Sequence, residues 1–235
     1  MTRMANELYS GGEYLARNPT WHVEDSAWKA QQILRMLQRH SLTPRTICEV
    51  GCGAGEVLRQ LQSRMDPSCE FCGYDISPQA IALCRERAND RLRFHCRDFL
   101  QEAGASFDLL LLIDLIEHLE DYNSFLRAVK PRSRYTILHI PLDLSVQAKL
   151  RPGKLRAIRQ VAGHLHYFTR ATALDGLRDA GYEIVDSFLT RGALESTHKQ
   201  LRTRVCNSFR RLAGVFGEDL ASRVLGGFSL LVLAT

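Results

Sequence analysis

The chain has 235 residues, 45% of them hydrophobic and 24% charged, and a net charge of +5, which is ordinary for a folded globular protein. It contains no run of 18 apolar residues and no apolar core near its N-terminus, so we expect neither a membrane span nor a secretory signal, and a cytoplasmic location follows by default. The seven cysteines lie mostly in apolar runs, and we expect reduced, buried thiols.

Four cysteines have a spacing that resembles a zinc site. Cys48, Cys52, Cys69 and Cys72 read C-x3-C…C-x2-C. However, Cys48 falls in a predicted strand, Cys52 in a glycine turn, and the other two at the start of the next strand. Because this arrangement lacks knuckle geometry, we predict no metal site.

The N-terminal segment combines a polar, aromatic arm with one helix. Residues 1–24 show no periodicity, but Tyr14, Trp21 and Trp28 are costly to leave in water, so we expect the arm to fold over the mouth of a ligand site. A helix should begin near Asp25 or Ser26 and end near His40. Its predicted buried stripe is Ala30, Ile33, Leu34 and Leu37.

The stretch from Ile47 to Leu58 predicts a strand, a glycine turn and a helix. Glycines alternate at Gly51, Gly53 and Gly55, which suits a backbone that must bend through positive φ or touch a ligand. A dinucleotide turn has G-x-G-x-x-G, and carboxylates beside a diphosphate would repel it. Here Glu49 and Glu56 flank the glycines and would attract an ammonium group.

This turn resembles motif I, E/D-x-G-x-G-x-G, of class I S-adenosylmethionine (SAM)-dependent methyltransferases. SAM carries an amino group and a sulfonium and no phosphate, so an acidic flank is compatible with it. The alternative is a tight strand-to-helix turn that binds no ligand.

Acidic residues follow the next two predicted strands. Asp75 ends the strand that begins at Glu70, lies 20 residues past Gly55, and is placed to accept both ribose hydroxyls. The alternative role is a helix N-cap. After the strand at 92–96, the resemblance implies that Asp98 binds the adenine amino group and that Phe99 packs on the ring; the alternative for Asp98 is an ordinary loop position.

The apolar run at 107–114 predicts a central strand that is buried on both faces. It leads into Asp114-Leu115-Ile116-Glu117-His118-Leu119, which resembles the F-D…E-H segment of the small-molecule branch of these enzymes, including ubiquinone-biosynthesis-type methyltransferases. The later pattern G-H-x-x-x-F-T…A-G-Y-E-I, from Gly163 onward, is similar to the same branch. The resemblance covers residues 47 to about 188.

The resemblance implies an α/β fold, a doubly wound, mostly parallel seven-stranded sheet of the Rossmann-like methyltransferase type. Strands are predicted at 135–141, from Glu183, and at 228–233, the last one antiparallel. We expect one domain: an N-terminal arm and helix (1–42), a core (43–188), a helical insertion (189–227) and a last strand (228–235). Within the insertion, an amphipathic helix carries Leu201, Val205, Phe209 and Leu212, and a shorter helix runs from Asp219 to Leu225.

The expected function is transfer of a methyl group from SAM, with S-adenosylhomocysteine as the second product. The expected cofactor-binding residues are Glu49, Gly51, Cys52, Gly53, Gly55, Asp75, Ile76, Asp98, Phe99, Asp114 and Leu115. The candidate proton acceptors are His118, His164 and His166, each of which could instead pack or cap a helix. His139, inside a strand, is more consistent with a satisfied core histidine.

The acceptor is not specified by these motifs. Residues 145–211 carry 13 Lys/Arg and 5 Asp/Glu, a net charge of +8, whereas the first 144 residues are mildly acidic. This basic segment is either a solvated face or a roof that attracts an acidic small molecule. Nucleic acid is disfavoured, a monomer or homodimer is expected, and two other functions stay open: a non-catalytic SAM-binding or assembly protein, and a nucleotide-dependent oxidoreductase.

Overall fold

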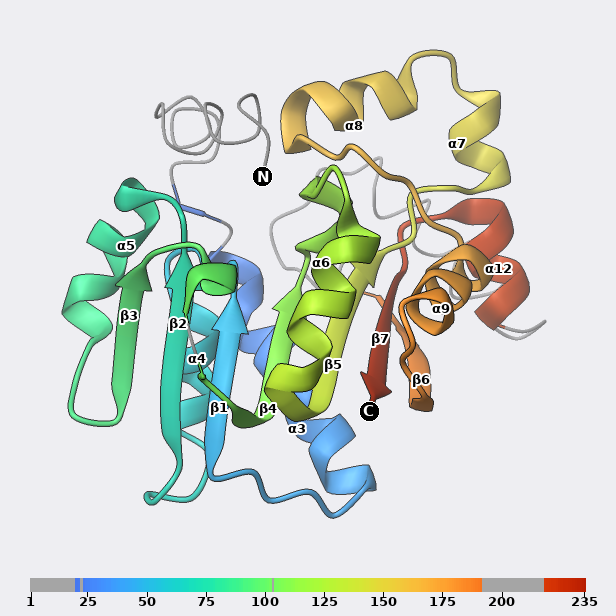
Figure 1. The fold of residues 1–235 in the computed structure, drawn as a ribbon. Coiled ribbons are helices and arrows are strands. Elements are labelled where there is room, and N and C mark those ends of the chain that lie inside the picture. Colours follow the sequence, from blue (N-terminus) through green and yellow to red (C-terminus); the bar gives the residue numbers. More distant parts are fainter. Residues whose placement is uncertain (1–19, 22, 103, 192–217) are drawn as a thin grey trace.

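The computed structural model describes residues 20–21, 23–102, 104–191 and 218–235, which fold around one seven-stranded sheet (Figure 1). The strand order is β3-β2-β1-β4-β5-β7-β6, and β7 pairs antiparallel with both neighbours while the other pairs are parallel. The strands are β1 (Thr46–Val50), β2 (Glu70–Asp75), β3 (Leu92–Cys96), β4 (Phe107–Ile113), β5 (Ser133–Pro141), β6 (Ile184–Thr190) and β7 (Ser229–Ala234). The predicted fold, including the antiparallel last strand, is confirmed.

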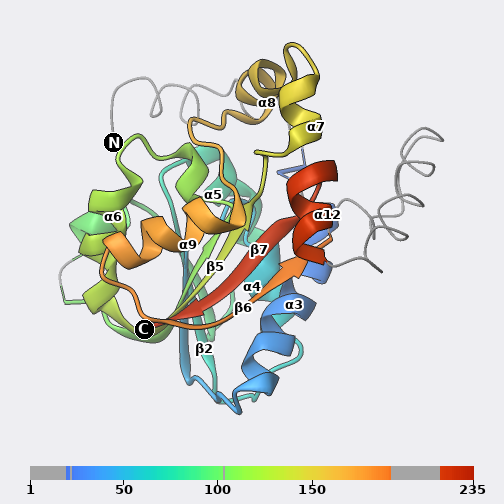
Figure 2. The same ribbon diagram turned by 90° about the vertical axis from the view of Figure 1, so that its right-hand side faces the viewer.

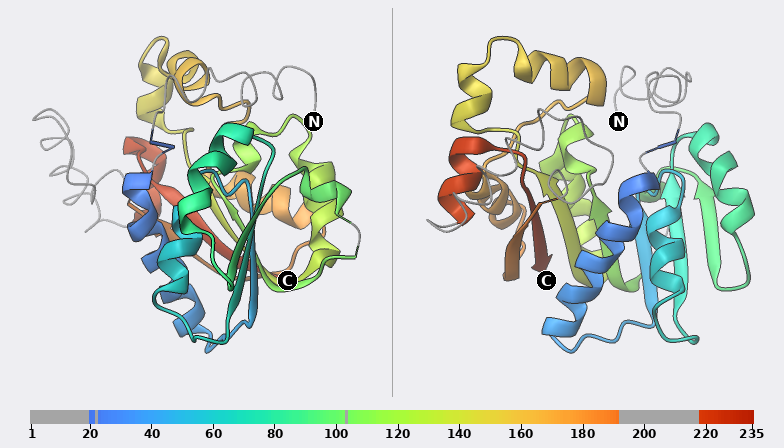
Figure 3. Two further views of the ribbon diagram at one scale, coloured as in Figure 1. Left: turned by 90° about the vertical axis from the view of Figure 1, so that its left-hand side faces the viewer. Right: turned by 180° about the vertical axis from the view of Figure 1, so that it is seen from behind.

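Helices cover both faces of the sheet, as parallel strands require (Figures 2 and 3). On one face α6 (Tyr122–Val129) and α9 (Arg170–Asp179) pack against Leu110 and Leu112 of β4. On the other face α3 (Ser26–Arg39) and α4 (Glu56–Gln62) pack against Leu109 and Leu111, and α5 (Pro78–Cys84) lies beside them. Alternate leucines of β4 therefore enter opposite cores, which explains its uninterrupted apolar sequence.

The chain between β5 and α9 differs from its prediction. The basic segment between these elements, for which the sequence analysis predicts no helix, contains α7 (Val146–Leu150) and α8 (Lys154–Ala162), which lie beyond the carboxyl ends of the central strands (Figure 1). The apolar residues Leu155, Ile158 and Val161 of α8 recur every three residues, but no residue of this helix is fully buried. The short α12 (Glu218–Leu225) agrees with its prediction, whereas the amphipathic helix expected around Leu201 lies outside the described residues.

The other helix ends lie close to their predicted positions. The α3 helix begins at Ser26 and is preceded by a 3₁₀ turn at Val23–Asp25. The α5 helix begins at Pro78 and is followed by a 3₁₀ turn at Arg85–Arg87. Among the described residues, no helix is long and apolar enough to cross a membrane.

The turn between β1 and α4 has no room for a side chain at Gly55. Its φ is +74°, and a Cβ there would lie 2.4 Å from the Phe94 ring and 3.1 Å from the Cys84 sulfur. The α4 helix then begins at Glu56, whose carboxylate accepts hydrogen bonds from Arg59, Gln60 and Arg87.

We expect Gly55→Ala to lower the free energy of unfolding by about 3 kcal/mol, because it adds a clash with Phe94 to the cost of positive φ. Gly153→Ala is the matched control, since Gly153 has φ +79° and a Cβ added there would meet no atom within 4 Å. The control should lose only about 1 kcal/mol in urea unfolding. Equal losses in the two variants would contradict the steric argument.

Glu56 should contribute to acid-dependent stability. Hydrogen bonding from Arg59, opposed by burial and reinforced by Arg87, lowers the pKa of Glu56 from 4.5 to about 2. A depressed carboxyl pKa stabilises the fold above pH 4.5, and the contribution disappears as the pH falls toward 2. We expect Glu56→Gln to have a free energy of unfolding about 1 kcal/mol lower than that of the unchanged chain at about pH 7. Near pH 2 the two free energies should be equal. A deficit that is independent of pH would contradict this account.

Candidate functional site

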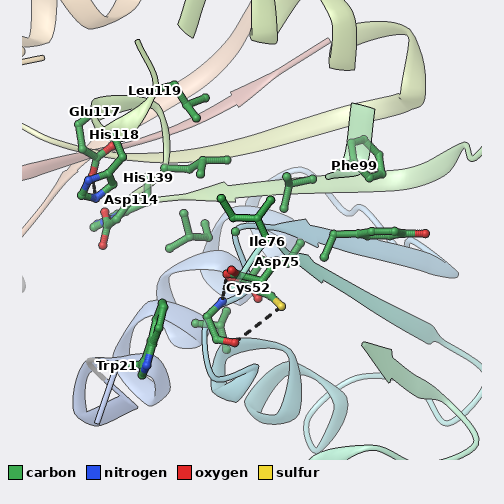
Figure 4. A pocket seen from close by; sticks show the side chains of 18 of the residues that line it. Trp21, Cys52, Asp75, Ile76, Phe99, Asp114, Glu117, His118, Leu119 and His139 are labelled. Atoms are coloured by element: carbon green, nitrogen blue, oxygen red, sulfur yellow. Dashed lines mark hydrogen bonds and ion pairs between the residues drawn. The ribbon is translucent and has the colours of Figure 1, made fainter. Parts of the chain in front are cut away.

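A cavity of about 980 Å³ opens at the carboxyl ends of β1, β2 and β4, and residues of α3 and Ala162 of α8 also line it. Figure 4 shows side chains of its wall from close by. Ligands in sheets of this kind bind at this edge. The aromatic side chains Trp21 and Trp28 form part of its wall, so the part of the N-terminal arm that the structure describes does reach the cavity. Residues 1–19 and 22 of the arm lie outside the described residues.

Asp75 lies at the end of β2 and joins the glycine turn to the following loop. Its carboxylate accepts hydrogen bonds of 2.8 Å from the backbone N–H of Gly53 and from that of Ser77. Ser77, and not Asp75, caps α5, because the Ser77 hydroxyl accepts from the Ala80 N–H. Burial raises the pKa of Asp75, although these backbone donors oppose the shift. A carboxylate has about four acceptor sites, so Asp75 can accept further hydroxyl groups from the cavity side.

Glu49, in β1 just before the glycine turn, has an incompletely satisfied carboxylate. The residue is 2% exposed, and its Oε2 has no hydrogen-bond partner among the described residues. Burial raises the pKa of Glu49 well above its ordinary value, and Lys29 only partly opposes this shift. A buried acceptor of this kind is costly unless a donor or cation reaches it. Since Glu49 lines the cavity, such a group could come from a ligand.

Asp114 connects three elements at the end of β4. Its Oδ2 lies 2.8 Å from Lys29 Nζ of α3, and its Oδ1 lies 2.5 Å from His139 Nδ1 of β5. The other ring nitrogen of His139 lies 3.0 Å from the Thr190 hydroxyl. Burial acts to raise the pKa of Asp114, but Lys29 and His139 hold it well below its usual range. His139 is thus the satisfied core histidine that was expected.

Another part of the cavity wall is formed by the turn after β3. The Asp98 carboxylate accepts from the Leu100 N–H, so Asp98 begins the 3₁₀ turn at Phe99–Gln101 while also lining the cavity. Phe99 is 1% exposed and packs edge-on against Tyr74, with ring centroids 5.1 Å apart. Its ring therefore belongs largely to the core, and adenine contact by Phe99 stays a prediction.

A cluster of two histidines and two carboxylates, His118, His164, Glu117 and Asp143, lies at the end of the cavity near α8. His164 Nδ1 is 2.6 Å from an oxygen of Asp143, and the rings of His118 and His164 meet edge to face at 4.9 Å. Glu117 beside them is fully buried. Burial, with His164 adding to it, lowers the pKa of His118 to about 4, so this imidazole is neutral near neutral pH.

The cavity brings together most of the residues predicted from sequence. Those in its wall are Glu49, Gly51, Cys52, Gly53, Asp75, Ile76, Asp98, Phe99, Asp114, Leu115, His118 and His164. Gly55 does not line it and instead makes room for Phe94. His166 also lies outside the lining: it is partly exposed, and its Nε2 contacts the Glu120 carbonyl.

Sequence analysis missed Lys29, Glu117 and Asp143. Lys29 precedes Ile33 and Leu37 by four and eight residues, so a lysine on the apolar stripe of α3 was the available signal. Glu117 was noticed only as part of a motif, and no feature of the sequence pairs Asp143 with His164.

Comparisons with known proteins agree with this geometry. A family model described as "Methyltransferase domain" matches residues 21–187. The chain is 29% identical over 131 residues to the ajmaline N-methyltransferase of Rauvolfia serpentina, covering 50% of this chain and 44% of that protein. It is 32% identical over 85 residues to a ubiquinone biosynthesis O-methyltransferase of Sinorhizobium fredii, covering 34% of this chain and 33% of that protein. The chain thus spans about half or less of the length of these curated relatives.

A solved structure shows the same fold. Magnesium protoporphyrin IX methyltransferase from Synechocystis with bound S-adenosylhomocysteine has a TM-score of 0.60 at 15% identity, and the match covers 98% of this chain and 97% of that one. At this identity the likeness concerns the fold alone.

Lys29 should be needed for stability, because it neutralises a carboxylate that is largely removed from water. We expect Lys29→Met to lower the free energy of unfolding by about 2–3 kcal/mol, since Asp114 keeps only His139 as a partner. The double variant Lys29→Met with Asp114→Asn should recover part of that loss, because no unpaired charge is left. Both are measured by urea unfolding near neutral pH. A double variant that loses the sum of the two single losses would show that the ion pair is not the cause.

Proposed function

Since the chain belongs to the methyltransferase domain family, we propose that it transfers a methyl group from SAM to a small-molecule acceptor. The single observation that carries the proposal is Glu49, a buried carboxylate with an unpartnered oxygen directly beside the glycine turn. The positively charged amino group of SAM would supply the hydrogen-bond donor that Oε2 of Glu49 lacks. Such a pairing would also lower the raised pKa of Glu49 and keep it ionised.

The residues around the cavity fit the rest of the cofactor. In this proposal Glu49 and the turn from Gly51 to Gly53 hold the methionyl part, and Asp75 accepts the ribose hydroxyls. Asp98 and the neighbouring Phe99 and Leu100 hold the adenine. The remaining expected contacts, Cys52, Ile76, Asp114 and Leu115, lie in the same wall. SAM supplies an activated methyl group on a sulfonium, and the protein has to align the acceptor with it and exclude water.

We place the acceptor at the end of the cavity formed by His118 and His164. His164 is the better candidate proton acceptor, because Asp143 fixes its orientation through Nδ1 and a pKa of about 4 makes His118 a weak base. His166, outside the wall, is not assigned a role. The relatives methylate nitrogen or oxygen according to their names, so the acceptor atom is left open.

The connection between β5 and α9 supports an acceptor site that is covered from above. Ala162 at the end of α8 and His164 both line the cavity, and Lys154, Arg156 and Arg159 belong to the same helix. A positive roof would favour an acidic small molecule over a neutral one. We further propose that the protein acts in the cytoplasm, as a monomer or homodimer, without nucleic acid as its substrate.

Calorimetry with SAM, S-adenosylhomocysteine and NAD⁺ tests the cofactor assignment. We expect SAM to bind and NAD⁺ not to bind. Glu49→Gln should weaken SAM binding about 10–100-fold, because it removes a charged partner of the amino group. Asp75→Ala should reduce the free energy of SAM binding by about 1–3 kcal/mol, because the ribose hydroxyls lose their acceptor. Glu70→Gln, at the exposed amino end of β2, is the matched control and should bind SAM normally.

Two outcomes would overturn the proposal. Unchanged SAM affinity in both Glu49→Gln and Asp75→Ala would remove the assigned cofactor site. SAM binding without release of S-adenosylhomocysteine for any acceptor in a panel of amines, phenols and carboxylic acids would favour a non-catalytic SAM-binding protein.

A further inference from the structure

Glu117 is the least satisfied ionisable group in the cavity wall. It is 0% exposed, and neither of its carboxylate oxygens has a hydrogen-bond partner among the described residues. Burial raises the pKa of Glu117 well above its ordinary value, and Asp114 adds to the shift. Isolated carboxylates are rarely buried, and those that are buried usually contact a cation or a donor.

Two histidines offer nitrogen atoms beside this carboxylate. Potential ligand atoms of Glu117, His118 and His164 all lie within 4.8 Å of one another, and His118 Nε2 is 3.9 Å from Glu117 Oε1. Asp143 engages Nδ1 of His164 at 2.6 Å, which leaves Nε2 as the coordinating atom. A carboxylate on the second nitrogen is the usual support of a metal-bound histidine.

The fold holds these three side chains together through the backbone. The Glu117 carbonyl accepts hydrogen bonds from the N–H groups of Leu165 and His166, at 2.7 and 3.1 Å. His118 Nδ1 lies 3.3 Å from the Gly163 carbonyl. The segment after β4 is therefore joined to the segment after α8, so the cluster does not depend on flexible surface side chains (Figure 4 shows Glu117 and His118).

We propose that Glu117, His118 and His164 bind a divalent transition-metal cation. Two imidazoles and one carboxylate are a typical donor set for Zn²⁺, Co²⁺ or Fe²⁺, whereas Mg²⁺ and Ca²⁺ prefer oxygen ligands alone. Bonds of about 2.0–2.2 Å would place the donor atoms roughly 3.3 Å apart in a tetrahedral site, so contraction by up to about 1.5 Å completes the site. This proposed site shares no residue with the four-cysteine pattern, for which the sequence predicts no metal.

All three side chains line the cavity, so an ion bound to them would keep a coordination position facing it. That position suits an oxygen or nitrogen atom of the acceptor. A bound cation would lower the pKa of a coordinated acceptor hydroxyl, so its proton would pass to water at the cavity mouth, and the oxygen left behind would take the methyl group from SAM. This acceptor role rests on the proposed function and makes His164 a ligand instead of a base; the binding of the ion does not depend on it.

The test is a titration of the full, tag-free chain with Co²⁺, after removal of bound metals with a chelator, followed by visible absorption. We expect one equivalent of Co²⁺ with absorption bands typical of a nitrogen- and oxygen-ligated site, and displacement of Co²⁺ by Zn²⁺. Glu117→Gln and His164→Ala should weaken Co²⁺ binding at least about 100-fold, and Asp143→Asn should weaken it about 10–100-fold, the usual effect of losing a carboxylate partner of a ligand.

His166→Ala is the matched control, because His166 lies two residues away but outside the cavity wall, and it should bind Co²⁺ as the unchanged chain does. Far-UV circular dichroism and SAM calorimetry show whether each variant is folded. Equal Co²⁺ affinity in the unchanged chain, Glu117→Gln and His164→Ala would overturn the site, as would the absence of stoichiometric binding. If the unchanged chain binds Co²⁺ but does not bind SAM, the metal site stands and only the cofactor assignment is refuted.

Discussion

The ion pair between Lys29 and Asp114 is the interaction on which the arrangement of the site depends. Asp114 directly follows the central strand β4, has a φ of +50° that non-glycine residues rarely adopt, and contacts Lys29 of α3 on one side and His139 of β5 on the other. A carboxylate in that position needs a cation in order to stay ionised. Lys29 supplies it from α3, and the helix is thereby fixed against the carboxyl edge of the sheet where Trp28 and the glycine turn meet the cavity.

The rest of the cavity has an excess of carboxylates over cations. Glu49 and Glu117 are both almost fully buried, and each has an oxygen that no described donor reaches. The Lys29 ammonium lies 2.8 Å from Asp114 and makes no hydrogen bond to Oε2 of Glu49 or to either oxygen of Glu117. The wall of the cavity therefore has two places where a cation from outside would relieve a desolvated charge. One lies beside the glycine turn and the other beside two histidines, which suits two chemically different cations, an ammonium group and a metal ion.

The fold was predictable because its signals are local and repeated. The apolar strands, the glycine turn and the acidic residue after β2 follow directly from composition and spacing, and the resemblance supplied the antiparallel direction of β7. The helices α7 and α8 were missed because they are short, at five and nine residues, and polar or basic residues separate their few apolar positions. Lys29 was missed for another reason: its partner Asp114 is 85 residues away in the chain, and only the folded sheet brings the two together.

The same limit applies to the histidines. A motif places Glu117 beside His118, but it does not show that this segment is hydrogen-bonded to Gly163 and Leu165. Nor does it show that Asp143 orients His164. His164 and His166 are equivalent by sequence, each in the loop before α9, yet His164 lines the cavity, whereas His166 does not and contacts the Glu120 carbonyl through its Nε2. The choice between them is made by the backbone hydrogen bonds that join the segment after β4 to the segment after α8. The acceptor end of the cavity is therefore formed by two segments that lie far apart in the chain, one after β4 and the other after α8, and backbone hydrogen bonds hold them together.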